Sequence, residues 1–135
     1  MIFESSALLS FSEDIQNRSF TDWIKAHISF MYPLHAYNGR VRIEGNMFMF
    51  SGAERKTGND FQLNIFRNEI EELYLGYDNV FTVFETRNLG FGWKPIRITF
   101  TRNQRTLRLY LIVNYSLGKT DNAIWLEILK NWLRA

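Results

Sequence analysis

The chain of 135 residues has about the length of one domain, and its 46% hydrophobic and 16% aromatic residues are typical of a protein with a packed core. The absence of cysteine excludes a disulfide framework, a thiolate zinc site and a cysteine nucleophile. Sixteen Lys and Arg against fourteen Asp and Glu leave a net charge of +2, which is too small to imply a nucleic-acid partner without a concentrated basic patch.

The first residues favour neither export nor a membrane anchor. Glu4 stands where a signal peptide carries basic residues, and the apolar stretch after it is short. No later run approaches the ~20 apolar residues that cross a bilayer. We therefore expect a cytoplasmic protein, either free or at the inner face of the membrane. Residues 1–135 are interpreted as a single domain in which residues 1–19 form an N-terminal extension of undecided order.

The segment before the first clear strand has a mixed pattern. Ser12 to Arg18 is compatible with a short helical turn, and the apolar residues from Ala26 to Met31 alternate as in a strand, while the residues between are ambiguous.

The clearest hairpin runs from residue 40 to residue 50, where the pair Gly45-Asn46 joins an alternating strand to an apolar one. A two-residue turn fixes which residues oppose each other. The expected pairs are Val41 with Phe50 and Ile43 with Phe48 on the core side, and Arg42 with Met49 and Glu44 with Met47 on the other side.

A second group of elements follows a polar loop expected over Ser51 to Asn59. Alternation from Phe61 to Ile65 predicts a half-buried strand. The next strand, Ile70 to Tyr77, is interrupted by Glu71-Glu72, which indicates a bulge or a bend. The β-branched and aromatic residues from Val80 to Phe84 favour a further strand.

The last elements are a hairpin and a helix. Ile96 to Phe100 and Leu107 to Val113 alternate on either side of a polar turn at Arg102 to Arg105. The C-terminal residues repeat at one-turn spacing, and Thr120 or Asp121 can cap their helix. The apolar stripe expected to pack on the sheet is Ile124, Trp125, Ile128, Leu129, Trp132 and Leu133.

In order and spacing, these segments resemble pleckstrin-homology-like (PH-like) domains, and in particular their GRAM branch. The resemblance is carried by the hairpin Gly39 to Ser51, by Phe61-Gln62-Leu63, by Glu69 to Leu73, by the two final strands and by the helix around Trp125. It covers roughly residues 37 to 133. It implies a mainly β fold with a C-terminal α-helix: a PH-like barrel of two antiparallel sheets, with about seven strands, capped by one helix. The open side of such sheets has to be covered, and a helix with two tryptophans suits that role.

Nothing in the sequence assembles a catalytic site. His27 and His35 lack the spacing and the acidic companions of a metal site. Gly90 to Gly92 lacks the third glycine of a dinucleotide motif, and neighbours such as Glu71 and Glu72 point to opposite faces of a strand. We expect a protein that is not an enzyme and has no cofactor and no metal.

A lipid-binding function is suggested by basic residues beside the first hairpin. The resemblance implies a Lys followed by a basic-x-basic pair, which Arg40 and Arg42 match, and Lys25 stands for the Lys although it lies further upstream. Guanidinium groups bind anionic head groups in a bidentate manner. Met47 and Met49, on the same face as Arg42, would enter the interface. In the plainer alternative, the N-terminal segment covers the methionines and the arginines are solvated.

A protein-binding function is suggested by Leu89, Phe91 and Trp93 in a glycine-containing loop, because aromatic anchors are typical of interface cores. Self-association would use the same features, and the alternative is that these rings pack over the mouth of the barrel. A small apolar ligand in a lipocalin-like barrel is a further possibility, which a large interior cavity would favour.

A nucleic-acid partner ranks last. Arg97, Arg102, Arg105 and Arg108 lie on one hairpin, but Tyr110 is nearly alone there as an aromatic that could stack on bases. The sequence therefore predicts a non-enzymatic PH-like binding module that acts through protein contacts or weak association with anionic lipid.

Overall fold

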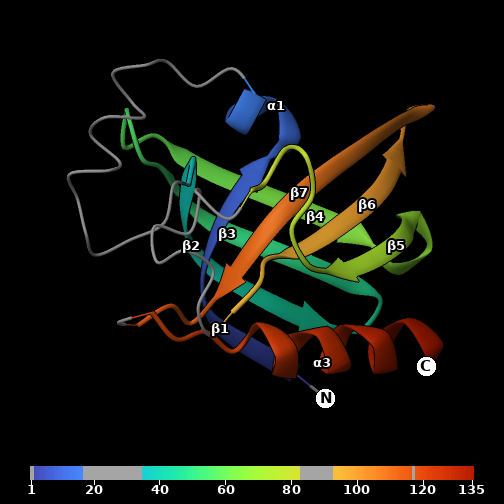
Figure 1. Ribbon diagram of the computed structural model, residues 1–135. Helices are drawn as coiled ribbons and strands as arrows, with labels where there is room; N and C mark the ends of the chain where they lie inside the picture. Colours follow the sequence, from blue (N-terminus) through green and yellow to red (C-terminus); the bar gives the residue numbers. More distant parts are fainter. Residues whose placement is uncertain (1, 17–34, 83–92, 117) are drawn as a thin grey trace.

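The structure, a computed structural model, describes residues 2–16, 35–82, 93–116 and 118–135 (Figure 1). Its elements in chain order are β1 (Ile2–Phe11), α1 (Ser12–Gln16), β2 (Tyr37–Glu44), β3 (Met47–Glu54), β4 (Asp60–Phe66), the 3-10 turn η1 (Arg67–Glu69), β5 (Ile70–Leu75), β6 (Ile96–Arg102), β7 (Arg105–Val113) and α3 (Asn122–Arg134). The mainly β class and the C-terminal helix are as expected.

All seven strands of the described chain belong to one antiparallel sheet, in the order β4-β3-β2-β1-β7-β6-β5. The sheet curls into a half-barrel with α3 along one side (Figure 1). The expectation of two sheets was wrong, because β1 pairs with β2 along one edge and with β7 along the other and so joins the two hairpins.

β1 also changes the interpretation of the N-terminus. Residues 2 to 11, expected to lie in an extension of undecided order, form the central strand of the sheet. Alternate side chains explain this position, since Phe3, Ala7 and Leu9 enter the main core. The short helical turn expected after it is α1.

The first hairpin has the predicted register, with Val41 opposite Phe50 and Ile43 opposite Phe48, and all four side chains are buried. β3 extends to Glu54, so the strand takes the first part of the segment that was expected to be a loop. The bulge expected at the two glutamates is present as a register shift between Ile70 and Glu72.

The second hairpin closes between Arg102 and Arg105, as expected. Its two turn residues, Asn103 and Gln104, have φ values of 52° and 64°, which give a tight turn the twist of its strands.

Two facing glycines, Gly39 and Gly52, allow the strands of the first hairpin to approach closely. A Cβ atom on Gly39 would lie 2.1 Å from the backbone oxygen of Ser51, and one on Gly52 would lie 2.1 Å from that of Asn38. Only glycine permits this approach. Near these glycines, the rings of Tyr37 and Phe61 stack with centroids 3.8 Å apart.

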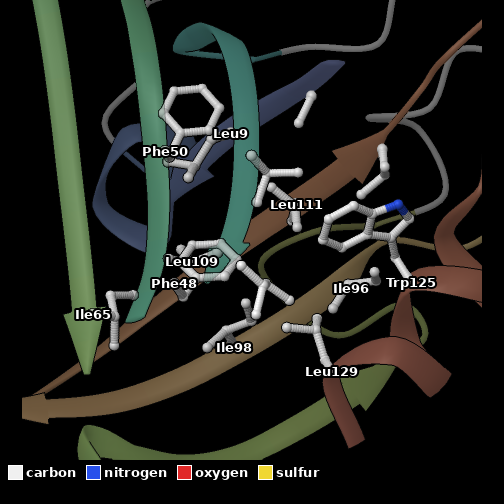
Figure 2. Packing of buried hydrophobic residues seen from close by; sticks show 14 of the residues in the cluster. Leu9, Phe48, Phe50, Ile65, Ile96, Ile98, Leu109, Leu111, Trp125 and Leu129 are labelled. Atoms are coloured by element: carbon white, nitrogen blue, oxygen red, sulfur yellow. The ribbon is translucent and has the colours of Figure 1, made fainter. Parts of the chain in front are cut away.

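The concave side of the sheet holds the main core, and α3 packs against it. Figure 2 shows Trp125 and Leu129 reaching from the helix towards Ile96 and Leu111. At the end of α3, the Trp132 indole Nε1 donates to the Gly45 carbonyl oxygen at 2.7 Å. The helix therefore covers the open side of the curled sheet from β7 to the first hairpin turn.

The buried stripe of α3 is Trp125, Leu126, Leu129 and Trp132, with Ile128 and Leu133 at its borders. Ile124, predicted to be in the stripe, is 61% exposed instead. The reason is that buried Asn122 starts the stripe: its amide accepts from Val113 N and donates to the Lys94 carbonyl oxygen, both at 2.7 Å. The helix is thereby rotated so that Leu126 faces the sheet.

The helix start uses both predicted capping residues, but differently from expectation. Asp121 occupies the N-cap position without a capping bond from its side chain, and its carboxylate accepts from Asn114. The Thr120 hydroxyl accepts the Asn122 N–H at 3.3 Å.

A second, smaller core lies on the convex side of β1 and β7 and contains Leu8, Ile15, Phe81, Trp93, Tyr110 and Ile112. Val80 and Phe81, expected in a strand, instead follow a turn held by Asp78, whose carboxylate accepts both of their N–H groups. Residues 83 and 84, the last two of the predicted strand, lie outside the described residues.

Candidate protein-binding face

The convex face of β1 to β4 carries rows of side chains that run across the four strands. Because the register is known for each strand pair, the rows can be read directly. The first row is Ile2, Glu44, Met47 and Phe66, and the second is Glu4, Arg42, Met49 and Asn64. We define the outer patch as these two rows together with Arg40 from the next row, leaving out Asn64. Its members are Ile2, Glu4, Arg40, Arg42, Glu44, Met47, Met49 and Phe66.

The apolar members of the outer patch are unusually exposed. Ile2 is 52% and Phe66 46% exposed, and Met47 and Met49 are half-buried. Met47 lies directly between Glu44 and Phe66 in the first row. β1 lies beside β2 within the sheet and therefore does not cover Met47 or Met49. The alternative in which the N-terminal segment covers these methionines is thus wrong for residues 2 to 11.

The charged members of the outer patch neutralise one another. Arg40 Nε lies 2.8 Å from Glu4 Oε1, and Arg42 Nη2 lies 3.0 Å from Glu44 Oε2. The hydrogen bond from Arg40 is the main reason why the pKa of Glu4 lies below its ordinary value. All four side chains are solvent-exposed, so these pairs add little stability. With two arginines and two glutamates, the outer patch has no formal net charge.

The residues predicted for lipid binding are partly brought together. Arg40 and Arg42 lie on the same face as Met47 and Met49, as the alternation predicted. Lys25 lies outside the described residues.

Of the residues predicted for partner binding, the structure describes only Trp93, which lies away from the outer patch. Trp93 is only 6% exposed and packs in the smaller core, with its ring edge-on to Tyr115. Leu89 and Phe91 lie outside the described residues.

Sequence reasoning did not find three members of the outer patch, namely Ile2, Glu4 and Phe66. The first two belong to β1, which was not recognised as a strand. The available signal was the partial alternation of Phe3 and Ala7 with Glu4 and Ser6, which Leu8 interrupts. Phe66 continues the polar side of β4, where an exposed aromatic ring is not expected from periodicity.

The basic cluster on the second hairpin is largely paired with acids. Arg102 Nη2 lies 2.9 Å from Glu69 Oε1, and its Nη2 also donates to the Asn64 carbonyl oxygen. Arg105 Nη2 lies 3.8 Å from Glu13 Oε1. These contacts leave less positive charge for a phosphate backbone than the sequence suggests.

A buried polar network surrounds Asp78. Its carboxylate accepts from the Tyr110 hydroxyl at 2.7 Å and from Arg97 at 3.0 Å, in addition to the two N–H groups of its own turn. Burial alone would raise the pKa of Asp78, but the hydrogen bonds, first that from Phe81 N, outweigh it and lower the pKa. Burial and the bond to Asp78 raise the pKa of Tyr110 to about 12. With its oxygens occupied in this way, Asp78 holds the turn in place.

Other chemistry finds little support in the described residues. They contain no group of three His, Cys, Asp or Glu side chains placed to hold a metal ion. Within the same residues, no helix has the length and apolarity needed to cross a membrane. A half-open groove of about 290 Å³ lies between α1 and β7, lined by Phe11, Ser12, Glu13, Gln16, Thr106, Leu107 and Arg108.

No protein-family model matches the sequence, and no curated protein matches it significantly.

Proposed function

We propose that the chain is a non-enzymatic binding module of PH-like type that contacts another protein through the outer patch. The observation that carries this proposal is the exposure of Ile2 and Phe66 in one row with Met47, on a face whose charges are already paired. Apolar side chains inside a polar, self-neutralised frame suit a protein surface of similar character. The curled sheet and the C-terminal helix support the PH-like resemblance.

Photo-crosslinking in cells tests the proposal. Benzoylphenylalanine in place of Met49 should give a discrete adduct with another protein, and Phe66→Ser in the same chain should abolish it. The matched control is the same crosslinker at Ile124, which is exposed but lies on α3 outside the outer patch. No adduct from Met49, or the same adduct from both positions, would contradict the proposal.

Association with anionic lipid is the second candidate, because Arg40 and Arg42 stand beside the half-buried Met47 and Met49. The paired glutamates weaken this attraction, since the outer patch is neutral overall. Co-sedimentation with phosphatidylserine vesicles should show binding that salt reduces and that an Arg40→Ala, Arg42→Ala double variant loses. Absence of binding at low salt removes this candidate.

A lipocalin-like site for a small apolar ligand has less support. Its ligand would occupy the concave side of the sheet, where Phe48, Phe50 and Phe100 are fully buried and Trp125 enters from the helix (Figure 2).

A further inference from the structure

The main chain of the edge strand β4 points outwards at every second residue. At the two ends of the strand, Glu54 N donates to the Asn59 carbonyl oxygen and Arg67 N donates to the Asn46 carbonyl oxygen. The register between them has no shift, so the odd-numbered residues bond towards β3. The residues whose main-chain groups point away from the sheet are therefore Asp60, Gln62, Asn64 and Phe66.

One half of this edge is closed and the other half is open. At the closed half, Phe66 N donates to Glu69 at 2.8 Å and the Asn64 carbonyl oxygen accepts from Arg102. Nothing in the part of the chain that the structure describes bonds to the outward N–H and carbonyl groups of Asp60 and Gln62, and both residues are exposed. An unpaired edge of this kind can accept one more strand, with two main-chain bonds at each of the two residues.

Between these two residues, Phe61 presents a partly buried ring on the concave side of the sheet. The ring stacks on Tyr37 of β2 with an angle of 19° between the planes, across Gly52, which lies opposite Phe61 on β3. Its other aromatic neighbours are Phe11 of β1 and Phe50 of β3. All of these rings belong to strands on the inner side of β4. The ring face turned away from Tyr37 is therefore directed towards the open edge, where an added apolar side chain would cover it.

The charge at the open half favours a basic residue in the added strand. Asp60 is exposed and has no ion pair among the described residues. In an antiparallel partner, the residue opposite Asp60 places its side chain beside the carboxylate on the convex face. The residue opposite Phe61 places its side chain beside the ring on the concave face. The complementary segment thus has a polar residue opposite Gln62, an apolar residue opposite Phe61 and a basic residue opposite Asp60.

We propose that an extended segment of another protein, with this order of side chains, adds to the sheet antiparallel to the open half of β4. Main-chain bonds to Asp60 and Gln62 supply affinity, while the Phe61 ring and the Asp60 carboxylate supply specificity. This site lies at the sheet edge and does not depend on the outer patch.

A synthetic peptide tests the main-chain part of the proposal. The probe is Thr-Val-Thr-Leu-Lys-Val with blocked ends, in which the second Thr, the Leu and the Lys would face Gln62, Phe61 and Asp60. Added up to about 2 mM to the isotope-labelled chain, it should shift the backbone amide signals of Asp60 and Gln62 in a saturable manner in NMR spectra. N-methylation of the second Thr removes the N–H that bonds to Gln62 and should weaken binding about tenfold or more. N-methylation of the Leu, whose N–H points away from β4, is the matched control and should change the dissociation constant less than about threefold.

Charge reversal tests the side-chain part. Asp60→Lys should weaken binding of the peptide about fivefold or more, and a peptide with Glu in place of its Lys should restore binding to this variant to within about twofold of the original pair. Glu127→Lys makes the same change of net charge on α3, at an exposed carboxylate, and should leave binding within about twofold.

Absence of a saturable shift in the wild-type chain overturns the proposal. So does an equal effect of the two N-methylated peptides, an equal effect of Asp60→Lys and Glu127→Lys, or a Glu-containing peptide that fails to restore binding.

Discussion

The docking of α3 on the curled sheet gives the strongest prediction about stability. Trp125 is 4% exposed and packs among apolar side chains of the sheet and the helix (Figure 2). Truncation of a buried tryptophan to alanine removes its transfer free energy and leaves a cavity, which together cost about 3–5 kcal/mol. Trp125→Ala should therefore lower the free energy of unfolding by about 4 kcal/mol. With a urea dependence of about 2 kcal/mol/M, the midpoint should fall by about 2 M.

The neighbouring residue supplies the control. Ile124, 61% exposed, has little packing to lose, and alanine has the higher helix propensity, so Ile124→Ala should shift the midpoint by less than about 0.3 M. The assay is urea denaturation followed by far-ultraviolet circular dichroism. Similar shifts for the two variants would refute the docking of α3 through Trp125, as would a larger shift for Ile124→Ala.

Three other predictions concern the sheet and its network. The pKa of Tyr110 is raised from 10.0 to about 12 in the folded protein, so the folded state keeps the hydroxyl proton to a higher pH than the unfolded state does. The free energy of unfolding gained in this way is complete below pH 10 and is lost as the pH rises through about 12. Tyr110→Phe should abolish this alkaline loss and cost about 1.5–3 kcal/mol at neutral pH, measured by urea denaturation at each pH; an identical pH profile in the variant would refute the assignment. Gly39→Ala places a Cβ 2.1 Å from a backbone oxygen and should lower the free energy of unfolding by about 3 kcal/mol or more, measured by thermal denaturation. Gly45→Ala, at a φ of +61° with open space around it, should lower the free energy of unfolding by about 1–2 kcal/mol. Asn122→Ala should lower the free energy of unfolding by about 2–4 kcal/mol because it leaves the buried Val113 N–H and the part-buried Lys94 carbonyl oxygen without their partner, and a loss below 1 kcal/mol in urea would contradict their bonding to the amide.

Local patterns predicted the hairpins because each carries its own register. A two-residue turn at Gly45 determined which residues face Val41 and Ile43, and the glutamate pair after Ile70 indicated the bulge. The joining of the two hairpins into one sheet could not be predicted in this way. It depends on β1, whose partners are distant in the sequence and whose short polar residues weaken its alternation.

The binding face was predicted only in part for the same reason. Arg40 and Arg42 were placed correctly beside Met47 and Met49 by the hairpin alone. The neutralisation of Arg40 by Glu4 comes from β1, a contact between residues 36 positions apart. The loop tryptophan, Trp93, was predicted as a partner anchor because sequence cannot tell an exposed ring from one buried in a second core.

The central position of β1 supports both the outer patch and the order of strands that leaves β4 at an edge. Solution NMR tests it most directly, through cross-strand nuclear Overhauser contacts of backbone protons on the two sides of β1. The structure predicts contacts of Glu4 with Arg42 on one side and of Leu9 with Leu111 on the other. Random-coil shifts for residues 2 to 11, or contacts to only one of the two neighbouring strands, would contradict the single seven-stranded sheet.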